Sequence, residues 1–275
     1  MSVESTDCHP LSLTRKIEDF PIANMPLSAH QLVAVGGADF GFHPHAWLDP
    51  AEIAGLTSTL VDAENTPIAW SGIAPDLSNV TVAENSFIIR YPWDFLRANE
   101  LFIASLTKNS IAGVIHPLAV IEGVIHLGEG TRILPGVFIE GNVVIGANCK
   151  IGPNCYIRGN TSIGDGCHIG QSVEIKNCLI LSKTNVGHLS YIGDSVLGEK
   201  VNLGAGTTTS NLRHDGKNHR SMVGGVLLDT GRRKFGTVIG DHVHTGINTS
   251  IYPGRKLWPN TSTRPAEIVQ HDHIS

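Results

Sequence analysis

Aliphatic residues recur at every sixth position through the middle of the chain. From Ile115 to Ile175, eleven consecutive positions spaced six apart are all Ile or Leu. The spacing slips by one residue after Ile175, slips again before Leu197, and resumes from Ile239 to Leu257 after an interruption. A period of six matches neither the 3.6-residue repeat of an amphipathic helix nor the two-residue alternation of a half-buried strand. It indicates short strands that are separated by regularly placed corners.

Three such strands make one triangular coil of about 18 residues. The inward aliphatic side chain then stacks on its counterpart in the next coil, about 4.8 Å away. Glycine often follows the aliphatic residue, as at Gly146, Gly164 and Gly204, and small residues permit sharp corners. Stacked coils bury a continuous core and pair each backbone with the next. The sequence therefore predicts a mainly β protein with a parallel β-helix over residues 106–258.

Residues 1–105 lack the six-residue period, and we expect a small α/β domain there. Asp49, Pro50 and Glu52 form the pattern of an N-cap, a first-turn proline and a capping box. Asp94 is expected to cap a second helix. The expected elements are helices over 50–62 and 95–105 and strands over 80–82 and 87–91.

The repeat is interrupted over residues 211–236, where we expect an excursion between coils. This segment could contact a neighbouring subunit, recognise phosphate, or form a solvated loop. Residues 259–275 are expected to be a C-terminal tail. The basic residues of the excursion are Arg213, His214, Lys217, His219, Arg220, Arg232, Arg233 and Lys234.

Composition narrows the class of protein. The 275 residues include 30 Gly and 14 Pro and only 16% charged residues, which favours tight turns over long surface helices. With a net charge of -5 and no Lys/Arg-rich run, a nucleic acid is not an expected partner. No signal peptide and no uninterrupted apolar span is found, so we expect a soluble, cytoplasmic protein without a membrane segment.

Four of the five cysteines share one position in the repeat. Each lies two residues before a stacked Ile, where neighbouring repeats carry Val or Thr. We therefore expect small buried apolar side chains rather than disulfides or metal ligands. These four residues are Cys149, Cys155, Cys167 and Cys178. Cys8 is expected to lie in a mobile tail without a role.

Polar residues interrupt the six-residue repeat in three segments, 171–176, 187–194 and 201–211. Lys176 precedes His188 by 12 residues, and Asn202 follows His188 by 14. Because one coil is about 18 residues, these side chains fall on neighbouring coils. They are therefore expected to lie close together in the folded chain or in an assembled trimer.

Residues 145–254 closely resemble the acetyltransferase half of the bifunctional N-acetylglucosamine-1-phosphate uridylyltransferase/glucosamine-1-phosphate acetyltransferase family. The resemblance implies a left-handed β-helix of hexapeptide repeats and a homotrimer with sites between subunits. It also implies transfer of an acetyl group from acetyl-CoA to an amino-sugar 1-phosphate, in nucleotide-sugar biosynthesis, without a metal.

The family's functional residues map onto matching positions of this chain. By resemblance, His188 is the catalytic base, and Glu174 and Asn211 support it. The residues that match sugar-phosphate contacts are Arg158, Lys176, Tyr191, Asn202 and Lys234. Ala205 matches a backbone contact to acetyl-CoA, and Ile247 stands near the cofactor where a small polar residue is expected.

Elementary chemistry agrees with this assignment. A sugar ammonium must lose a proton before it attacks a thioester, and a histidine with a pKa near 6.5 accepts a proton close to neutral pH. Arginine and lysine supply the fixed cations that a phosphate needs. No cysteine lies in the polar segments, so we expect direct transfer rather than a covalent intermediate.

The N-terminal part departs from the family. The stretch 91–96 resembles the junction between a sugar nucleotidylyltransferase domain and its β-helix. Nucleotidyl transfer needs a glycine-rich loop with a basic residue, but Gly36-Gly37 is followed by Ala38, Asp39 and Phe40. We therefore expect a remnant without nucleotide transfer. The coils that hold acetyl-CoA look shortened, so the acyl group could differ from acetyl.

Two other functions stay open. A metal enzyme of the γ-carbonic anhydrase kind shares this fold and needs three His ligands. The chain has fourteen His, including the pairs His242/His244 and His214/His219, but none has the expected spacing to His188. A non-catalytic scaffold or regulatory subunit is the other alternative, favoured by the missing nucleotidylyltransferase motif and the short C-terminus.

Overall fold

The computed structural model describes residues 5–37 and 40–274, so Ala38 and Asp39 of the glycine-containing stretch lie outside the described residues. The chain forms two compact units. The first comprises Arg15–Pro21 and Met25–Arg90, and the second comprises Thr6–Thr14, Ile22–Asn24 and Tyr91–Ser275. Each unit is described separately below.

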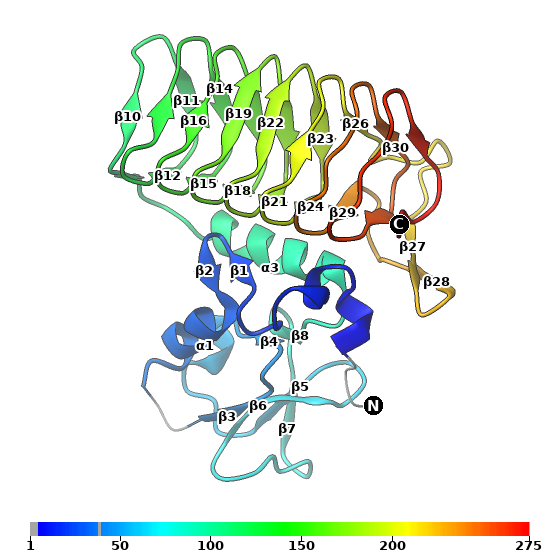
Figure 1. Cartoon of the computed structure of the whole chain (residues 1–275). Helices are drawn as coiled ribbons and strands as arrows, with labels where there is room; N and C mark the ends of the chain where they lie inside the picture. Colours follow the sequence, from blue (N-terminus) through cyan, green and yellow to red (C-terminus); the bar gives the residue numbers. More distant parts are fainter. Residues whose placement is uncertain (1–4, 38–39, 275) are drawn as a thin grey trace. The chain divides into compact units, whose positions relative to one another are not determined.

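The second unit is built on parallel coils whose strands form three sheets (Figure 1). The six-stranded sheet contains β10 (Val114–Ile115), β13 (Arg132–Ile133), β16 (Lys150–Ile151), β19 (His168–Gln171), β22 (Asn185–His188) and β25 (Asn202–Leu203). One eight-stranded sheet contains β11 (Val120–Glu122), β14 (Phe138–Glu140), β17 (Tyr156–Arg158), β20 (Glu174–Lys176), β23 (Tyr191–Gly193), β26 (Thr208–Thr209), β30 (Ser250–Ile251) and β32 (Ile268–Val269). The other contains β9 (Ser110–Ile111), β12 (Ile125–Leu127), β15 (Val143–Ile145), β18 (Thr161–Ile163), β21 (Leu179–Ile180), β24 (Val196–Leu197), β29 (Thr237–Ile239) and β31 (Arg255–Leu257).

The six-residue repeat is the stacking pattern of these coils. Ile133 pairs in register with Ile151, and Ile151 pairs with Ile169, so each coil takes 18 residues here. Ile169 then pairs with Val186, which makes that coil one residue shorter and explains the first slip of the repeat. The expected fold class, a mainly β parallel β-helix preceded in sequence by a small α/β part, is confirmed.

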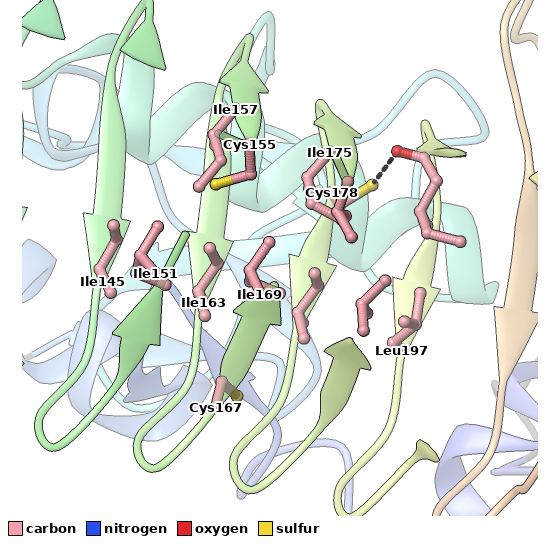
Figure 2. Packing of buried hydrophobic residues seen from close by; sticks show 14 of the residues in the cluster. Ile145, Ile151, Cys155, Ile157, Ile163, Cys167, Ile169, Ile175, Cys178 and Leu197 are labelled. Carbon is pink, nitrogen blue, oxygen red and sulfur yellow. Dashed lines mark hydrogen bonds between the residues drawn. The ribbon is translucent and has the colours of Figure 1, made fainter. Parts of the chain in front are cut away.

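The inward side chains form one continuous core, and Figure 2 shows part of it. The four repeat cysteines are buried in this core and are free thiols, as expected. Cys178 donates a weak hydrogen bond from Sγ to the carbonyl oxygen of Ile192, at 3.4 Å (Figure 2). Cys8 differs from expectation, because it ends a short 3-10 helix (Ser5–Cys8) and is fully buried.

The coils continue past the expected end of the repeat. Residues 259–273 form a further coil rather than a separate tail: β32 pairs with β30, and Val269 is buried. The aliphatic period fades because threonines point inward here. Thr249 and Thr263 share a hydrogen bond of 2.8 Å between their Oγ1 atoms. The two hydroxyl groups therefore have hydrogen-bond partners inside the core. Threonine does not, however, continue the aliphatic repeat in the sequence.

The excursion is an antiparallel hairpin of β27 (Arg220–Val223) and β28 (Val226–Asp229), which extends beyond the coils in Figure 1. Several contacts anchor it to the β-helix unit. His219 is buried and its Nε2 lies 2.9 Å from the carbonyl oxygen of Asn211. The buried Lys256 donates from Nζ to the carbonyl oxygen of Met222 at 2.6 Å. The excursion is therefore held in place rather than being a free loop.

Helix α3 (Pro92–Ala104) belongs to the β-helix unit, although it was expected within the N-terminal domain. It begins before Asp94, whose Oδ2 accepts a hydrogen bond from the backbone N–H of Tyr91 at 2.9 Å. Asp94 thus stabilises the first turn from inside the helix. The fully buried Asn99 accepts a hydrogen bond from Ser162 Oγ at 2.7 Å, which fixes α3 against the coils.

The first unit is a small α/β fold. Its sheets contain β3 (Phe40–Phe42), β5 (Thr59–Val61), β6 (Pro67–Ser71) and β7 (Val80–Val82), and β4 (Ala46–Trp47) with β8 (Phe87–Ile88). A short pair, β1 (Pro21–Ile22) and β2 (Met25–Pro26), precedes them. The strands expected near 80–82 and 87–91 are present, the second only over its first two residues.

The helices of the first unit differ from expectation. Helix α2 (Pro50–Ile53) is a single turn instead of a helix over 50–62. Asp49 caps it as expected, accepting from the N–H of Ala51 at 2.8 Å, but Gly55 follows with a φ of +77°, and β5 then begins at Thr59. Helix α1 (Leu27–Val35) was not expected. None of the helices in the described ranges has the length and apolar character that a membrane span requires.

Candidate functional site

Arg158 and Lys176 lie side by side on neighbouring coils. They occupy the last positions of β17 and β20, which pair in register. Arg158 contacts Glu174 through Nε at 2.8 Å and through Nη2 at 2.7 Å. Both side chains remain about one-third exposed, at 36% and 32%. The hydrogen bond with Glu174 raises the pKa of Arg158, so this guanidinium stays a fixed cation at the surface of the sheet.

Lys176 is held by a carboxylate that the sequence did not single out. Its Nζ donates to both oxygens of Asp194, at 3.0 and 2.8 Å. Asp194 also accepts hydrogen bonds from the side-chain amides of Asn177, at 3.1 Å, and Asn211. In the sequence, only the spacing pointed to Asp194, which follows Lys176 by about one coil length. In the structure, the backbone N–H of Asp194 donates to the Lys176 carbonyl oxygen. Asp194 therefore organises this part of the site.

Tyr191 completes the cluster. Its hydroxyl accepts a hydrogen bond from the Asn211 side chain at 2.9 Å. Burial, and next the nearby carboxylate of Asp194, raise the pKa of Tyr191, so the phenol stays protonated. Gly193 leaves room for this arrangement, because a Cβ there would lie 2.6 Å from both the Asn211 amide and the Tyr191 hydroxyl. A side chain at this position would displace both groups.

His188 lies at the corner that precedes Tyr191. It ends β22, and its ring is exposed. The N–H of Gly206 donates to the His188 carbonyl oxygen at 3.2 Å, and the N–H of Asn248 donates to the Ala205 carbonyl oxygen at 2.8 Å. His188, Ala205 and Ile247 are therefore stacked at the same corner of three consecutive coils. The residues expected to act as base and to contact the acyl donor lie in one column.

Several glycines lie next to this corner. A Cβ on Gly170 would lie 1.9 Å from the carbonyl oxygen of Gly187, and one on Gly204 would lie 2.6 Å from Gly246. Gly187, beside His188, differs: a Cβ there meets no atom within 4 Å. The coils are thus in close backbone contact on either side, with open space next to His188.

Two other expected site residues, Asn202 and Lys234, lie on β25 and in the excursion. Asn202 is exposed on β25, in one column with Asn185 and His244. Lys234 is exposed near the end of the excursion, where it pairs with Leu212. Within the described ranges, neither Glu174 nor Asn211 hydrogen-bonds to the His188 ring. Their support of the base therefore stays a prediction.

The described part of the chain contains no cluster of three or more His, Cys, Asp or Glu side chains that could hold a metal ion. What the site does contain is two adjacent cations, a tyrosine hydroxyl and an exposed imidazole at the next corner. Cations of this kind bind a phosphate, and an imidazole can accept a proton from an amine.

Parts of the chain are similar in sequence to known proteins. Residues 139–262 match the family model described as the GMPPB C-terminal domain. A bifunctional sugar-1-phosphate nucleotidylyltransferase/acetyltransferase from Sulfurisphaera tokodaii is 40% identical over 181 residues, which are 66% of this chain and 45% of that protein. The bifunctional protein GlmU of Methanococcus maripaludis is 47% identical over 184 residues, 67% of this chain and 44% of that protein.

The chain thus spans less than half the length of these relatives. Among solved structures, the polysialic acid O-acetyltransferase OatWY is 19% identical, with a TM-score of 0.29 over 62% of this chain and 82% of that one, a likeness too low to support an inference. The matches with the curated relatives cover their C-terminal acetyltransferase region. The β-helical part of this chain is therefore similar in sequence to the acetyltransferase regions of bifunctional sugar-1-phosphate nucleotidylyltransferase/acetyltransferases.

Proposed function

We propose that this chain transfers an acyl group from an acyl-coenzyme A to the amine of an amino-sugar 1-phosphate. Acetyl-CoA and glucosamine-1-phosphate are the substrates to test first. The observation that carries the proposal is the placement of His188, beside open space at the corner that leads to Tyr191, with Ala205 stacked on it. This placement lets an amine and a thioester approach the same imidazole.

Arg158 and Lys176 bind the phosphate in this proposal. Arg158 uses Nε and Nη2 for Glu174, which leaves Nη1 for a ligand. Lys176 donates two hydrogen bonds to Asp194, and an ammonium has three donors. Both cations are therefore oriented before the ligand arrives, which lowers the entropy cost of binding. Asp194 acts as a positioning residue for Lys176.

His188 takes a proton from the sugar ammonium, and the freed amine attacks the thioester carbonyl carbon. A C–N bond forms, the C–S bond breaks, and coenzyme A leaves as a thiol after taking up a proton. A histidine base typically contributes about 10²–10⁴ in rate. The open space at Gly187 is where the acyl-bearing arm reaches the imidazole in this proposal.

The proposal includes a homotrimer with the site between copies. Within one chain, the His188 side chain is exposed. The corner also carries exposed apolar side chains, Leu189 at 67% and Ile247 at 54%. A neighbouring copy packed against these side chains would enclose the imidazole and the acyl donor. Sedimentation analysis of the full chain and of Leu189→Asp tests this part.

The test of function incubates the purified chain with acetyl-CoA and glucosamine-1-phosphate and follows N-acetylglucosamine-1-phosphate by mass. A thiol-release dye is avoided because the chain has five cysteines of its own. The His188→Asn variant runs beside the wild type. Turnover that this variant loses supports the proposal. If wild type and variant are both inert with this pair and with longer acyl donors, the non-catalytic scaffold takes its place.

A further inference from the structure

The excursion carries a feature that acyl transfer does not use. Two pockets open on it, of about 520 and about 570 Å³. The first is lined by Leu212, Tyr252 and Pro253 among others, and the second by Lys217, Arg220 and Asp229 among others. Arg213 lines both, so the two pockets adjoin.

The walls of the first pocket are suited to a flat ring. Tyr252 is 47% exposed and Leu212 is 45% exposed. Both side chains line the first pocket, so they present apolar surface to a ligand there. An aromatic side chain of this kind offers a stacking face to a planar heterocycle, and this interaction tolerates any base because every base has a π-face.

The second pocket is cationic in a chain whose net charge is -5. Asp215 holds Arg213 through Nε at 2.8 Å and Nη2 at 2.6 Å, which leaves Nη1 unused. Lys217 and Arg220 are exposed and form no ion pair with any described carboxylate. Asp229 is the one carboxylate in the pocket lining, and it accepts the N–H of Gly231 at 2.8 Å. With Asp215 paired to Arg213, three cations stand against two carboxylates, and the remaining positive charge favours an anionic ligand.

The hairpin that carries Arg220 and Asp229 is fixed by the contacts of His219 and Lys256 described above. Phe235, at the end of the excursion, is also fully buried and packs edge-on against Trp93, with ring centroids 6.0 Å apart. A pre-organised surface loses little conformational entropy when a ligand binds.

We infer that the excursion binds a nucleoside diphosphate, with the base stacked on Tyr252 and Leu212 and the phosphates on Arg213, Lys217 and Arg220. Such a ligand joins a planar heterocycle to a polyanion. The first pocket provides aromatic and apolar surface for the heterocycle, and the adjoining second pocket provides cations for the polyanion. A free nucleotide and the adenosine diphosphate part of coenzyme A share this chemistry. The site does not depend on the proposed transfer reaction.

Equilibrium binding to the full chain tests the inference, with ADP, UDP, adenosine and pyrophosphate as separate probes. We expect saturable binding of both nucleotides, at least about tenfold tighter than pyrophosphate or adenosine alone, because stacking and charge act together. Tyr252→Ala and Arg220→Ala should each weaken nucleotide binding about tenfold. Lys150→Ala, which removes an exposed cation from β16 instead, should leave binding unchanged.

Competition identifies the source of the nucleotide. If coenzyme A displaces ADP and Tyr252→Ala raises the KM for acetyl-CoA, the ligand is the cosubstrate. If coenzyme A does not compete, the ligand is a free nucleotide. Binding of ADP no tighter than pyrophosphate, or equal binding by the Tyr252→Ala and Arg220→Ala variants and the wild type, would overturn the inference. Loss of acetyl transfer in His188→Asn does not affect this outcome.

Discussion

The carboxylate of Asp194 accepts two hydrogen bonds from the ammonium group of Lys176, at 3.0 and 2.8 Å. The two side chains are only 4% and 14% exposed. Asp194 is also bound by Asn177 and Asn211, so one carboxylate connects three polar side chains. The pair is therefore a structural element as well as part of the proposed phosphate site.

Removing one partner of this pair should destabilise the chain. Breaking a buried ion pair leaves an uncompensated charge and costs roughly 3–5 kcal/mol. We expect Asp194→Asn to lower the free energy of unfolding by an amount in this range, measured by urea denaturation. The double variant Lys176→Met/Asp194→Asn should recover much of that loss. A double variant that is no more stable than Asp194→Asn would contradict the coupling.

His188→Asn should reduce acetyl transfer by about 10²–10⁴ with little change in stability, because the ring is exposed and its loss removes a proton acceptor. Steady-state rates, with product detected by mass, measure the effect. His242→Asn is the matched control, since His242 is another exposed corner histidine with a φ of +59°. Equal rates for His188→Asn and wild type would remove His188 from the mechanism.

Gly170 and Gly187, which lie one coil apart, should differ in their response to substitution by alanine. Gly170→Ala places its Cβ 1.9 Å from the Gly187 carbonyl oxygen, whereas Gly187→Ala meets nothing within 4 Å. Gly170→Ala should cost about 1–3 kcal/mol of stability through forced separation of the coils. Gly187→Ala should fold normally but raise the KM for acetyl-CoA, because it fills the space beside His188. Thermal unfolding and kinetics of the two variants separate these effects.

Acid should weaken the anchor of the excursion. Burial lowers the pKa of His219 below its ordinary value of 6.5. As pH falls below 6.5, the unfolded chain therefore takes up a proton that the folded chain resists, and stability decreases. Between pH 7.5 and 5.5 we expect the urea midpoint to fall, and to fall less in His219→Asn. Other histidines with lowered pKa values, such as His43 and His168, account for the remaining fall.

The core thiols should be unreactive in the folded chain. Burial raises the pKa of Cys155 to about 12 and that of Cys178 to about 12, so almost no thiolate is present at pH 8. Iodoacetamide labelling followed by peptide mass analysis should modify these residues only after denaturant is added. Rapid labelling of Cys178 in the native chain would show that the coils open locally.

The repeat was predictable because each aliphatic side chain stacks on a copy of itself, so the periodicity of the sequence is the periodicity of the core. The last coil was not predicted because threonines take inward positions there in place of aliphatic residues. The hydroxyl groups of Thr249 and Thr263 form a hydrogen bond with each other across coils, so both have a partner inside the core. The helix expected over 50–62 failed at Gly55, where a positive φ ends the turn after only four residues. Outside the repeat, local patterns predicted the strand over 80–82 and the Asp49 cap, but not the length of the helix that Asp49 begins.

The site was predictable in part. Spacing placed Lys176, His188 and Asn202 on neighbouring coils, but the pairing of Lys176 with Arg158 was not predicted from it. The partners of these residues did not follow from spacing. Asn211, expected to support His188, instead binds Tyr191 and Asp194, since the excursion begins at that point of the coil. Side-chain pairing across coils depends on corner geometry, which the repeat does not encode.

The excursion leaves and rejoins the coil at one place. The N–H of Phe235 donates to the Asn211 carbonyl oxygen at 3.1 Å, and Leu212 pairs with Lys234. Beyond it, Ile239 stacks on Leu197 as if no residues had been inserted. Segments between Leu212 and Lys234 can therefore change in length and composition while the solenoid stays the same. This junction is a natural grafting point, where new recognition loops can be exchanged without redesigning the scaffold that carries the imidazole.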